Sequence, residues 1–425
     1  MSSRRIIVVG GGAAGFFAAI RCAELMSDAT VTVLEKGSEF LSKVRISGGG
    51  RCNVTHACFD ARELSAAYPR GDQALIGPFK RFHPEDTIAW FESRGVKLKV
   101  ERDGRLFPTT DSSATIIDCL MRTAKTAGVN LSTQRCVERV TRGSRAQFEL
   151  ALTDGDKMIC DRLLLATGGC RTALTGELAV SLGHSLEPPV PSLFAIHIET
   201  AWLRRLAGIS VPNAEASVAA AKLQEQGPLL ITHRGLSGPV ILRLSAWGAR
   251  VLHGCQYQFP IHINWLPGRS SEAIAIELGA LRDGQPARLV VNTPIPPLPA
   301  RLWEQLVLAA GVKSETRWST LSRSGQKELV RQLTRTEFPV TGKSLNKEEF
   351  VTCGGVRLSE VNFKTLESRI CPGLYFAGEL LDLDGITGGY NFQAAWTTGW
   401  IAGESMAAPS GVPAPFTSID RPAGL

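Results

Sequence analysis

The chain has 425 residues, of which 44% are hydrophobic and 20% charged, and its formal net charge is +7. This length exceeds that of one ordinary hydrophobic core, so we expect two or three domains, and the modest positive charge permits an anionic ligand without requiring one. Because no uninterrupted run of about 18 apolar residues occurs, no membrane-spanning helix is predicted.

The cysteines and the first residues bear on where the protein resides. The ten cysteines show neither a CxxC pair nor a zinc-like Cys/His spacing. We therefore expect reduced thiols, no metal site and a cytoplasmic protein that does not associate with membranes. Two arginines precede the first apolar run, but that run meets glycines too early for a cleavable export signal.

The N-terminal segment predicts a strand, a glycine turn, a helix and a second strand. After the apolar run Ile6–Val9, three glycines form a G-x-G-x-x-G motif: Gly10, Gly12 and Gly15. The first allows a tight turn, the second lets the backbone approach a pyrophosphate, and the third lets helix and strand pack closely. Glu35 ends the next strand, where a carboxylate accepts hydrogen bonds from ribose hydroxyls. We predict an adenine dinucleotide site; the alternative is a glycine turn with an ordinary surface glutamate.

A second glycine-rich segment, SGGGRCN, spans Ser47–Asn53. We expect a loop in which successive backbone N–H groups form a nest for phosphate or flavin oxygens. Arg51 is a candidate anchor for such a ligand, and a salt bridge inside the protein is an equal alternative. Cys52 has no neighbouring cysteine in the sequence, which argues against a redox thiol.

The middle of the chain predicts a change of domain. Two helices around a short hairpin are expected between residues 82 and 127, followed by strands between 131 and 165. The proline-rich segment Glu187–Ser192 predicts a domain boundary, and the strand-like segments after it indicate a β domain. Helical periodicity runs from Arg301 to about Arg335, after which short strands return.

One predicted helix carries a row of cations. They recur every four residues, which places them on one side of the helix: Arg323, Lys327, Arg331 and Arg335. This row is either a solvated basic face or a contact for RNA or another anionic partner. Because no RNA-binding module and no basic stripe with interleaved aromatic residues occurs, we do not expect nucleic acid as a partner.

Two later strand ends favour FAD over NAD as the dinucleotide. Apolar strands finish in small residues at Ala166–Gly169 and at Gly373–Glu379. A flavoprotein wraps a longer ligand than a nicotinamide enzyme does, so additional strand ends of this kind should converge on it. Glu379 would then hold a ribityl hydroxyl. No second G-x-G-x-x-G motif occurs, so NADH or NADPH is expected only as a transient electron donor.

The segment DGITGGYNFQAAW contains the start of the last predicted helix. Gly388 and Gly389 precede Tyr390 and Asn391, where this helix should begin before running to about Met406. A helix N-terminus aimed at the flavin N1/C2 carbonyl would stabilise negative charge on the reduced ring. The alternative is a glycine-rich helix start without a ligand. The small and apolar residues of this helix predict burial against the first domain.

Six segments resemble the bacterial BaiN-like flavoproteins: SGGGRCNVT, DGRLFP, LLLATGG, THRGLSGP, VTCGGVRLSEV and GLYFAGELLDLDGITGGYNFQAAWTTGWIAG. The resemblance runs from about Ile6 to Ala402. That family includes members called aminoacetone oxidases and members that act as bile-acid enone reductases. It implies an α/β fold in which a Rossmann-like FAD-binding domain is interrupted by an insert of β-barrel-like and helical subdomains.

The domain boundaries that follow from this resemblance and from the proline clusters are approximate. The FAD-binding domain would comprise 1–190 and 350–408, the barrel-like insert 191–268 with 336–349, and the helical subdomain 269–335. Residues 409–425 would form a loose tail. One departure from the family pattern lies at Cys170–His184, which is shorter than usual and lacks a tyrosine, so substrate roles taken from relatives are open there.

The motifs and the resemblance together imply a set of residues that contact FAD. They are Gly10, Gly12, Ala13, Ala14, Gly15, Glu35, Lys36, Lys43, Ser47, Gly48, Gly49, Gly50, Arg51, Asn53, Ala166, Thr167, Gly168, Gly378, Glu379, Gly388, Gly389, Tyr390 and Asn391. Two residues are candidates for proton transfer to a substrate: His233, for which a structural role as a loop cap is the alternative, and Tyr390.

The sequence thus predicts an FAD-dependent oxidoreductase that passes hydride between flavin N5 and a small organic substrate. NAD(P)H-linked reduction of an activated double bond is the leading reaction. An O₂-using oxidation of an amine of the aminoacetone type stays open as an alternative. An FAD-dependent enzyme that modifies RNA, or a protein that binds RNA, is the alternative of another class. The oligomeric state is left open.

Overall fold

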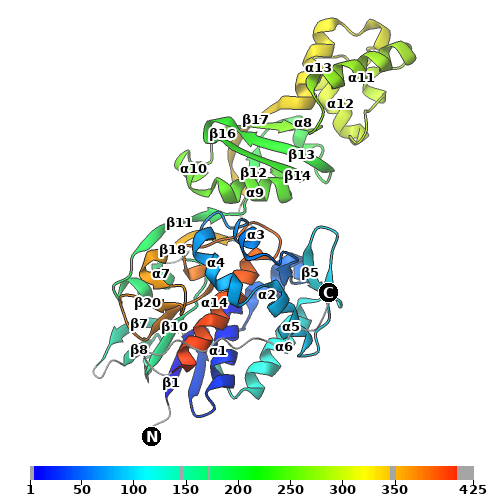
Figure 1. Cartoon of the computed structure of the whole chain (residues 1–425). Coiled ribbons are helices and arrows are strands. Elements are labelled where there is room, and N and C mark those ends of the chain that lie inside the picture. Colours follow the sequence, from blue (N-terminus) through cyan, green and yellow to red (C-terminus); the bar gives the residue numbers. More distant parts are fainter. Residues whose placement is uncertain (1–3, 144–146, 171–172, 345–350, 409–425) are drawn as a thin grey trace. The chain divides into compact units, whose positions relative to one another are not determined.

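The computed structural model describes residues 4–143, 147–170, 173–344 and 351–408. The chain divides into two compact units (Figure 1). Unit 1 comprises Met1–Val190 and Lys347–Leu425, and unit 2 comprises Pro191–Asn346. The predicted tail 409–425 and the joint at 345–350 lie outside the described residues. Each unit is treated by itself below.

Unit 1 is built on a sheet in the order β19-β20-β21-β10-β1-β2-β6. Its strands are β1 (Arg5–Val9), β2 (Thr30–Leu34), β6 (Asn130–Ser132), β10 (Arg162–Leu165), β19 (Val361–Asn362), β20 (Glu367–Ser368) and β21 (Leu374–Phe376). Strands β21, β10, β1, β2 and β6 run parallel, and β19 and β20 form an antiparallel edge. Because parallel strands end at one edge of the sheet, the segments after β1, β2, β10 and β21 meet there.

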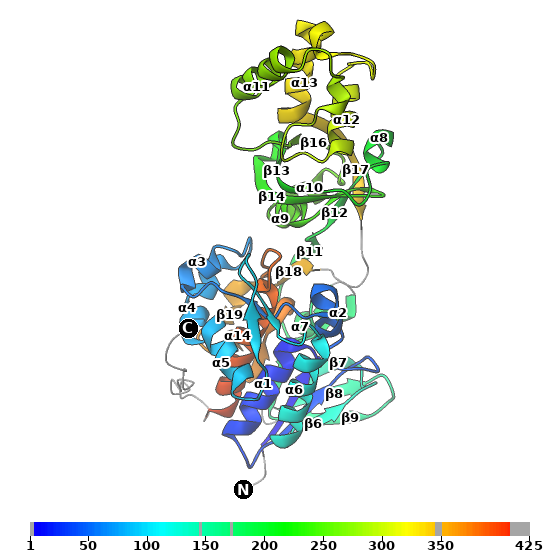
Figure 2. The same ribbon diagram turned by 90° about the vertical axis from the view of Figure 1, so that its right-hand side faces the viewer.

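Two helices from opposite ends of the chain pack together on this sheet, α1 (Ala13–Leu25) and α14 (Tyr390–Ala407) (Figures 1 and 2). Small residues let their backbones approach. A Cβ atom at Gly399 would lie 2.5 Å from the carbonyl oxygen of Ala14, and one at Gly403 would lie 2.6 Å from that of Ala18. Nearly all of α14 is buried, which confirms the predicted burial of the last helix against the first domain.

Further helices and short strands follow β2 in the chain and pack around the helix pair. They are α2 (Ser42–Gly50), β3 (Thr55–His56), α3 (Ala61–Ser65), α4 (Asp72–Arg81), α5 (Pro84–Glu92), β4 (Leu98–Val100), β5 (Arg105–Pro108) and α6 (Ser113–Thr126). The helices α5 and α6 around the β4–β5 hairpin confirm the prediction for residues 82–127. The bounds of α2 include the first part of the predicted loop Ser47–Asn53, but the backbone is non-helical at Ser47, Gly48 and Gly49, as that prediction requires.

The remainder of unit 1 forms smaller pieces. A sheet of β7 (Val137–Arg142), β8 (Phe148–Leu152) and β9 (Lys157–Cys160) precedes β10, and β11 (Leu186–Ser192) pairs in a second small sheet with β18 (Val351–Val356). Helix α7 (Ala173–Val180) lies between them in sequence, with the short helices η5 (Leu358–Glu360) and η6 (Gly378–Leu380) later in the chain. The proline-rich segment lies in β11, at the division between the two units.

Unit 2 contains a closed barrel in the order β12-β15-β14-β13-β16-β17. Its strands are β12 (Ala195–Ile198), β13 (Ser210–Val218), β14 (Leu223–Thr232), β15 (Gly235–Ser237), β16 (Phe259–Asn264) and β17 (Thr336–Ser344). Its helices are α8 (Ala201–Arg204), η2 (Ala219–Ala221), α9 (Pro239–Trp247), α10 (Ala249–Gly254), α11 (Ser271–Gly284), η3 (Val290–Asn292), α12 (Ala300–Ala309), η4 (Trp318–Thr320) and α13 (Arg323–Arg335). Buried Trp265, Trp303 and Trp318 belong to one core that joins barrel and helices.

The predicted fold class is confirmed. The domain that contains the Rossmann-like parallel sheet is interrupted in sequence between β11 and β18. The inserted residues form a barrel and a group of helices. Among the residues that the structure describes, no helix is both long enough and apolar enough to cross a bilayer.

Candidate FAD site

The glycines of the β1–α1 turn have different roles. A Cβ atom at Gly10, where φ is +113°, would overlap the carbonyl oxygen of Ala166, and one at Gly15 would overlap that of Gly10. These two glycines therefore allow the protein to pack against itself. A Cβ atom at Gly12 would have no neighbour within 4 Å. The open side of Gly12 leaves room for a ligand's pyrophosphate, as the motif requires.

The N-terminus of α1 is suited to an anion. Gly12 is its N-cap residue, and within the described residues no side chain caps the helix and no acidic residue lies in its first turn. The backbone N–H groups of Ala13, Ala14 and Gly15 therefore belong to a first turn that has no side-chain acceptor. Free N–H groups and the helix dipole favour a phosphate there.

Glu35 lies beside the same turn, at the end of β2. Its Oε2 accepts a hydrogen bond from Gly11 N and its Oε1 accepts one from Gly37 N, both at 2.8 Å. These bonds fix the carboxylate next to the glycine turn. Each carboxylate oxygen has a second lone pair, so both can still accept from ribose hydroxyls. Lys36 follows as an exposed side chain.

The ends of β10 and β21 meet the same region. Ala166, Thr167 and Gly168 follow β10, the neighbour of β1, and a Cβ at Gly168 would meet nothing within 4 Å. Gly378 packs against α1, since its Cβ would lie 2.9 Å from that of Ala14. Its N–H donates to Thr398 Oγ1 of α14 at 2.9 Å.

Glu379 and Lys43 form an ion pair between segments that are far apart in the sequence. The other carboxylate oxygen of Glu379 accepts from Thr352 N at 2.8 Å. Lys43 is exposed and comes from α2, so this pair connects the strand end after β21 to the helix beside the glycine nest. Two residues predicted to contact the cofactor are thus brought together.

Three successive glycines at the end of α2 have a left-handed backbone, and two of them face open space. Gly48, Gly49 and Gly50 have φ of +58°, +68° and +84°. Glycine adopts this left-handed backbone without steric strain, unlike other residues. Cβ atoms at Gly49 and Gly50 would meet nothing within 4 Å, which leaves space for a ligand. Ser47 closes the preceding turn by donating from Oγ to the carbonyl of Val44 at 2.9 Å.

Of the two alternatives for Arg51, the structure shows the internal salt bridge. Its guanidinium pairs with Glu101 at 2.5 Å and with Asp111 at 2.7 Å, and lies 3.9 Å from the ring centre of Phe107. The hydrogen bonds to Glu101 and Asp111 raise the pKa of Arg51. Arg51 therefore ties α2 to the β4–β5 hairpin.

The start of α14 is held closely by the chain around β3. Gly389 has φ of +97°, and its Cβ would lie 2.5 Å from the backbone carbon of Thr55. With its amide oriented to satisfy both neighbours, Asn53 Oδ1 accepts from Gly389 N at 2.9 Å. Asn391 exchanges two hydrogen bonds with the backbone of Gly385, at 2.8 and 2.9 Å.

Residues that the motifs did not single out also fix this region. Arg70 pairs with the fully buried Asp384, directly before the glycines that precede α14. Tyr68 donates from its hydroxyl to the carbonyl of Tyr390 at 2.5 Å. Thr55 donates from its hydroxyl to Gln393 Oε1 at 2.6 Å. No sequence motif identifies these contacts, because each joins segments more than 300 residues apart.

His56 is a further residue that the sequence interpretation missed. Its ring stacks on that of Tyr390 with centroids 4.7 Å apart and an interplanar angle of 22°. Its Nδ1 lies 3.0 Å from the carbonyl oxygen of Gly388. The only available signal was its position directly after the segment SGGGRCNVT.

The other candidates lie elsewhere or are inert. His233 is exposed in the turn between β14 and β15 of unit 2 and makes no hydrogen bond within the described chain, so it does not cap that loop. Cys52 is fully buried, and burial raises the pKa of its thiol to about 12. This protonated thiol fits the argument against a redox role.

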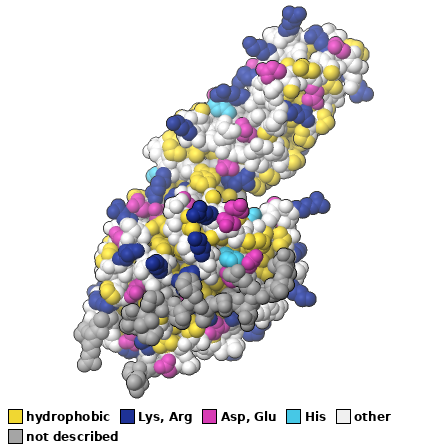
Figure 3. Space-filling model, in the orientation of Figure 1, with side chains coloured by type: hydrophobic (Ala, Val, Ile, Leu, Met, Phe, Trp, Pro, Cys, Tyr) yellow, Lys and Arg dark blue, Asp and Glu magenta, His cyan; other side chains and the backbone are white. Residues whose placement is uncertain are grey.

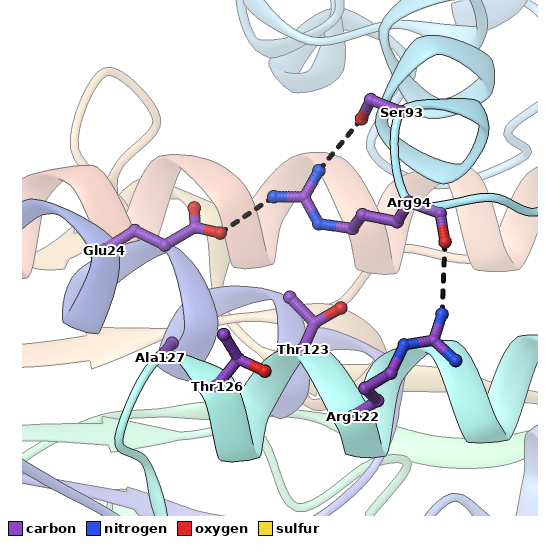
Figure 4. A pocket seen from close by; sticks show the side chains of 7 residues that line it. All are labelled: Glu24, Ser93, Arg94, Arg122, Thr123, Thr126 and Ala127. Atoms are coloured by element: carbon purple, nitrogen blue, oxygen red, sulfur yellow. Dashed lines mark hydrogen bonds and ion pairs between the residues drawn. The ribbon is translucent and has the colours of Figure 1, made fainter.

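A surface groove of about 540 Å³ lies near the C-terminal end of α1, at the opposite end of that helix from the glycine motif (Figure 4). Arg94 closes it by pairing with Glu24 at 2.8 Å and donating to Ser93 at 3.2 Å. Arg122 donates to the carbonyl of Arg94 at 3.1 Å. Because these polar groups satisfy one another, we assign no cofactor to the groove.

The chain can now be compared with known proteins. The family described as "HI0933-like protein Rossmann domain" matches residues 4–405. The chain is 29% identical over 95% of its length to the 3-dehydro-bile acid delta(4,6)-reductase of Clostridium scindens, covering 99% of that protein. It is 30% identical over 95% of its length to the ribosomal RNA dihydrouridine synthase of Escherichia coli, covering 98% of that protein.

A solved structure with the same fold is the 3-ketosteroid-delta4-(5alpha)-dehydrogenase of Rhodococcus jostii. It is 13% identical, with a TM-score of 0.52, over 96% of this chain and 98% of the other. The open glycine edge and the uncapped start of α1 are those that an FAD-binding Rossmann fold requires. The chain belongs to the HI0933-like Rossmann domain family, a family of FAD-dependent oxidoreductases.

Proposed function

We propose that this protein reduces a carbon–carbon double bond conjugated to a carbonyl group, using electrons that NADH or NADPH delivers through FAD. The observation that carries the proposal is the chemistry shared by its relatives. A 3-dehydro-bile acid delta(4,6)-reductase acts on ring double bonds beside a 3-oxo group, and a dihydrouridine synthase saturates the ring double bond beside a uracil carbonyl. Both reactions add two hydrogens to an activated C=C bond.

The chain's own residues would bind and orient the cofactor for this chemistry. Gly12 and the first turn of α1 would bind the pyrophosphate, and Glu35 the adenosine ribose. The pair formed by Glu379 and Lys43 lies where a ribityl chain could exchange hydrogen bonds with it. Bound FAD would supply reversible hydride transfer. The positive end of the α14 helix dipole would favour negative charge near it.

A conjugated C=C bond also needs a proton on the carbon that does not receive hydride. Tyr390 is the residue that we propose to deliver it. It begins α14, and its ring is held between His56 and Tyr68. A phenol has a dissociable proton and is a known general acid in proteins. His233, which is exposed in unit 2, stays the second candidate.

The test is anaerobic stopped-flow spectroscopy of the flavin-loaded protein. NADH or NADPH should bleach the flavin, and a steroid 4-en-3-one or a uracil-containing substrate should restore the yellow colour faster than O₂ does. The Gly12→Ala variant, which should bind FAD much more weakly, controls for reactions outside the site. Slow bleaching by both nicotinamides, together with peroxide release when aminoacetone is oxidised, would replace the proposal by the amine oxidase alternative.

A second candidate is the reduction of uridine within RNA. It is favoured by two curated relatives, from Escherichia coli and Haemophilus influenzae, that are named ribosomal RNA dihydrouridine synthases. The cations of α13 are a surface that could contact the phosphates of RNA. Arg331 is neutralised by Glu328 at 2.5 Å, whereas Arg323, Lys327 and Arg335 are exposed and form no ion pair within the described chain. On the visible face of unit 2, however, Lys and Arg side chains are scattered among acidic and uncharged ones (Figure 3).

RNA retention at different salt concentrations distinguishes this candidate. Replacing the three unpaired cations of α13 by glutamine should lower the slope of log affinity against log salt by about one for each phosphate that is no longer neutralised. A matched control replaces three exposed lysines of unit 1 by glutamine: Lys97, Lys125 and Lys157. An equal decrease in both variants would mean that only net charge matters, and no RNA retention at low salt would exclude the candidate.

A further inference from the structure

His56 is held at a defined tautomer by the start of α14. It ends β3, and its Nδ1 lies 3.0 Å from the carbonyl oxygen of Gly388. A carbonyl oxygen only accepts hydrogen bonds, so Nδ1 carries the proton of this bond. In the neutral ring, Nε2 therefore has a free lone pair and is the position at which a further proton can bind.

The surroundings of Nε2 are close and partly charged. The β4–β5 turn approaches it, because a Cβ atom at Gly104 would lie only 2.6 Å from Nε2. The charged groups that act on the ring, Asp103 and Arg105, come from the same turn and have opposite signs. The other neighbours are the ring of Tyr390 and the carbonyl of Gly388, from the segment that leads into α14.

These neighbours determine whether the His56 ring is neutral or protonated, and an additional charge nearby can change that. Burial lowers the pKa of His56 below its ordinary value, although the Gly388 carbonyl and Asp103 oppose this shift. The ring is therefore neutral near pH 7. A negative charge close to the start of α14 would favour the protonated ring. The stack on Tyr390 would then add a favourable contact between a cation and an aromatic face.

We propose that His56 is a positioning residue that takes up a proton when the bound FAD is reduced, and that it acts through Gly388 and the start of α14. This inference rests on the proposed FAD site but not on the proposed substrate. Bound FAD reduced by two electrons and one proton would carry one negative charge. A second proton, supplied by the buffer and held at Nε2 of His56, would form an imidazolium that balances this charge.

The predicted signature is an additional pH dependence of the flavin midpoint potential. Between the pKa of His56 in the oxidised protein and its higher pKa in the reduced protein, reduction would take up one more proton. The potential of the wild type should therefore fall more steeply with rising pH in that window. The His56→Gln variant keeps an N–H donor for the Gly388 carbonyl but cannot be protonated, so this steeper section should be absent.

The experiment is spectroelectrochemical titration of the FAD-loaded protein between about pH 5.5 and 8.5, where histidine titrates. His253→Gln is the matched control, because His253 is exposed on α10 of unit 2. It should keep the wild-type curve. Identical curves for the wild type and His56→Gln, with both proteins yellow, would overturn the proposal.

A second measurement covers the case in which His56→Gln does not fold. Histidine resonances of the wild-type protein can be titrated by NMR before and after reduction with dithionite. The resonance that shows contacts to Tyr390 should have a higher pKa in the reduced protein, and an unchanged pKa would also overturn the proposal. Neither experiment contains a substrate or a nicotinamide. Failure of enone reduction therefore leaves this inference standing, whereas colourless protein contradicts the FAD site itself.

Discussion

A Cβ atom at Gly15 would overlap the carbonyl oxygen of Gly10, so these two glycines are in direct backbone contact where β1 turns into α1. Gly12, between them, has φ of −94°, which any residue adopts, and open space beside it. The three glycines of one motif thus have separable roles. Two of them serve the packing of the protein, and one borders the space left for a ligand.

Substitutions at Gly12 and Gly15 should therefore fail in different ways. Gly15→Ala forces α1 away from the turn and should lower the free energy of unfolding by about 1–3 kcal/mol, as overpacking at a rigid contact does. Gly12→Ala should leave the unfolding of the FAD-free protein unchanged. Its methyl group would block the pyrophosphate and weaken FAD binding about 100-fold or more, the effect of losing two to three kcal/mol.

Urea unfolding and FAD titration measure these two quantities on the same preparations. The wild type, stripped of FAD, provides the reference for stability. If Gly12→Ala lost stability as Gly15→Ala does and kept its affinity for FAD, the assignment of Gly12 to the pyrophosphate would be wrong.

Glu35→Gln should weaken FAD binding. The amide oxygen can still accept from Gly11 N or Gly37 N, but the NH₂ group then faces the other N–H, so the turn loses one hydrogen bond as well as the charged acceptor for the ribose. Hydrogen bonds to a charged group contribute about 1.5–3 kcal/mol, so the dissociation constant of FAD should rise about 10- to 100-fold. Glu92→Gln, at the exposed glutamate that ends α5, is the control and should bind FAD almost normally. Equal affinities for Glu35→Gln and the wild type would mean that Glu35 only shapes the turn.

Much of the candidate site could be predicted from the sequence, because several of its backbone features depend only on residues that are neighbours in the chain. The β1–α1 turn, the position of Glu35 after β2 and the start of α14 at Tyr390 each depend on residues within a few positions of one another. Glycine spacing and apolar runs report such features directly. The alternation of strands and the proline clusters likewise indicated an insert, whose closed barrel came from the family resemblance.

The side-chain partners could not be predicted, because they depend on tertiary contacts. Arg51 pairs with Glu101 and Asp111, fifty to sixty residues away, and no pattern near Arg51 distinguishes that pairing from ligand binding. His56 lies beside Gly388 only because β3 packs against the start of α14.

Cys52 should be unreactive in the native protein. Its side chain is fully buried and burial raises the pKa of the thiol to about 12, so the thiolate that reacts with alkylating reagents is almost absent at pH 8. Cys255 is exposed on unit 2 and should be alkylated first. Peptide mass spectrometry after a brief iodoacetamide treatment measures both sites. Rapid labelling of Cys52 in folded protein would contradict its burial and would reopen a redox role.

The stability of the protein should decrease as the pH falls below about 6.5, and His184 should account for part of this loss. Its ring is buried, with Nδ1 at 3.0 Å from Glu360 Oε2 and Nε2 at 2.8 Å from Ser368 Oγ. The carboxylate accepts the Nδ1 proton, so Nε2 accepts from the serine hydroxyl and the neutral ring satisfies both partners. Burial lowers the pKa of His184 in the folded state, although Glu360 opposes this shift.

The direction follows from proton binding. Between the lowered pKa of folded His184 and the ordinary value near 6.5, the unfolded chain binds more protons, so acid favours unfolding by at most about 1.4 kcal/mol per pH unit for one such group. Above that window this contribution is constant. His184→Gln should be less stable at pH 8 but should lose less on acidification to pH 5, whereas His253→Gln should follow the wild type. Urea unfolding at both pH values decides the question, because an acid loss in His184→Gln as large as in the wild type would place the responsible proton elsewhere, with His56 as the next residue to replace.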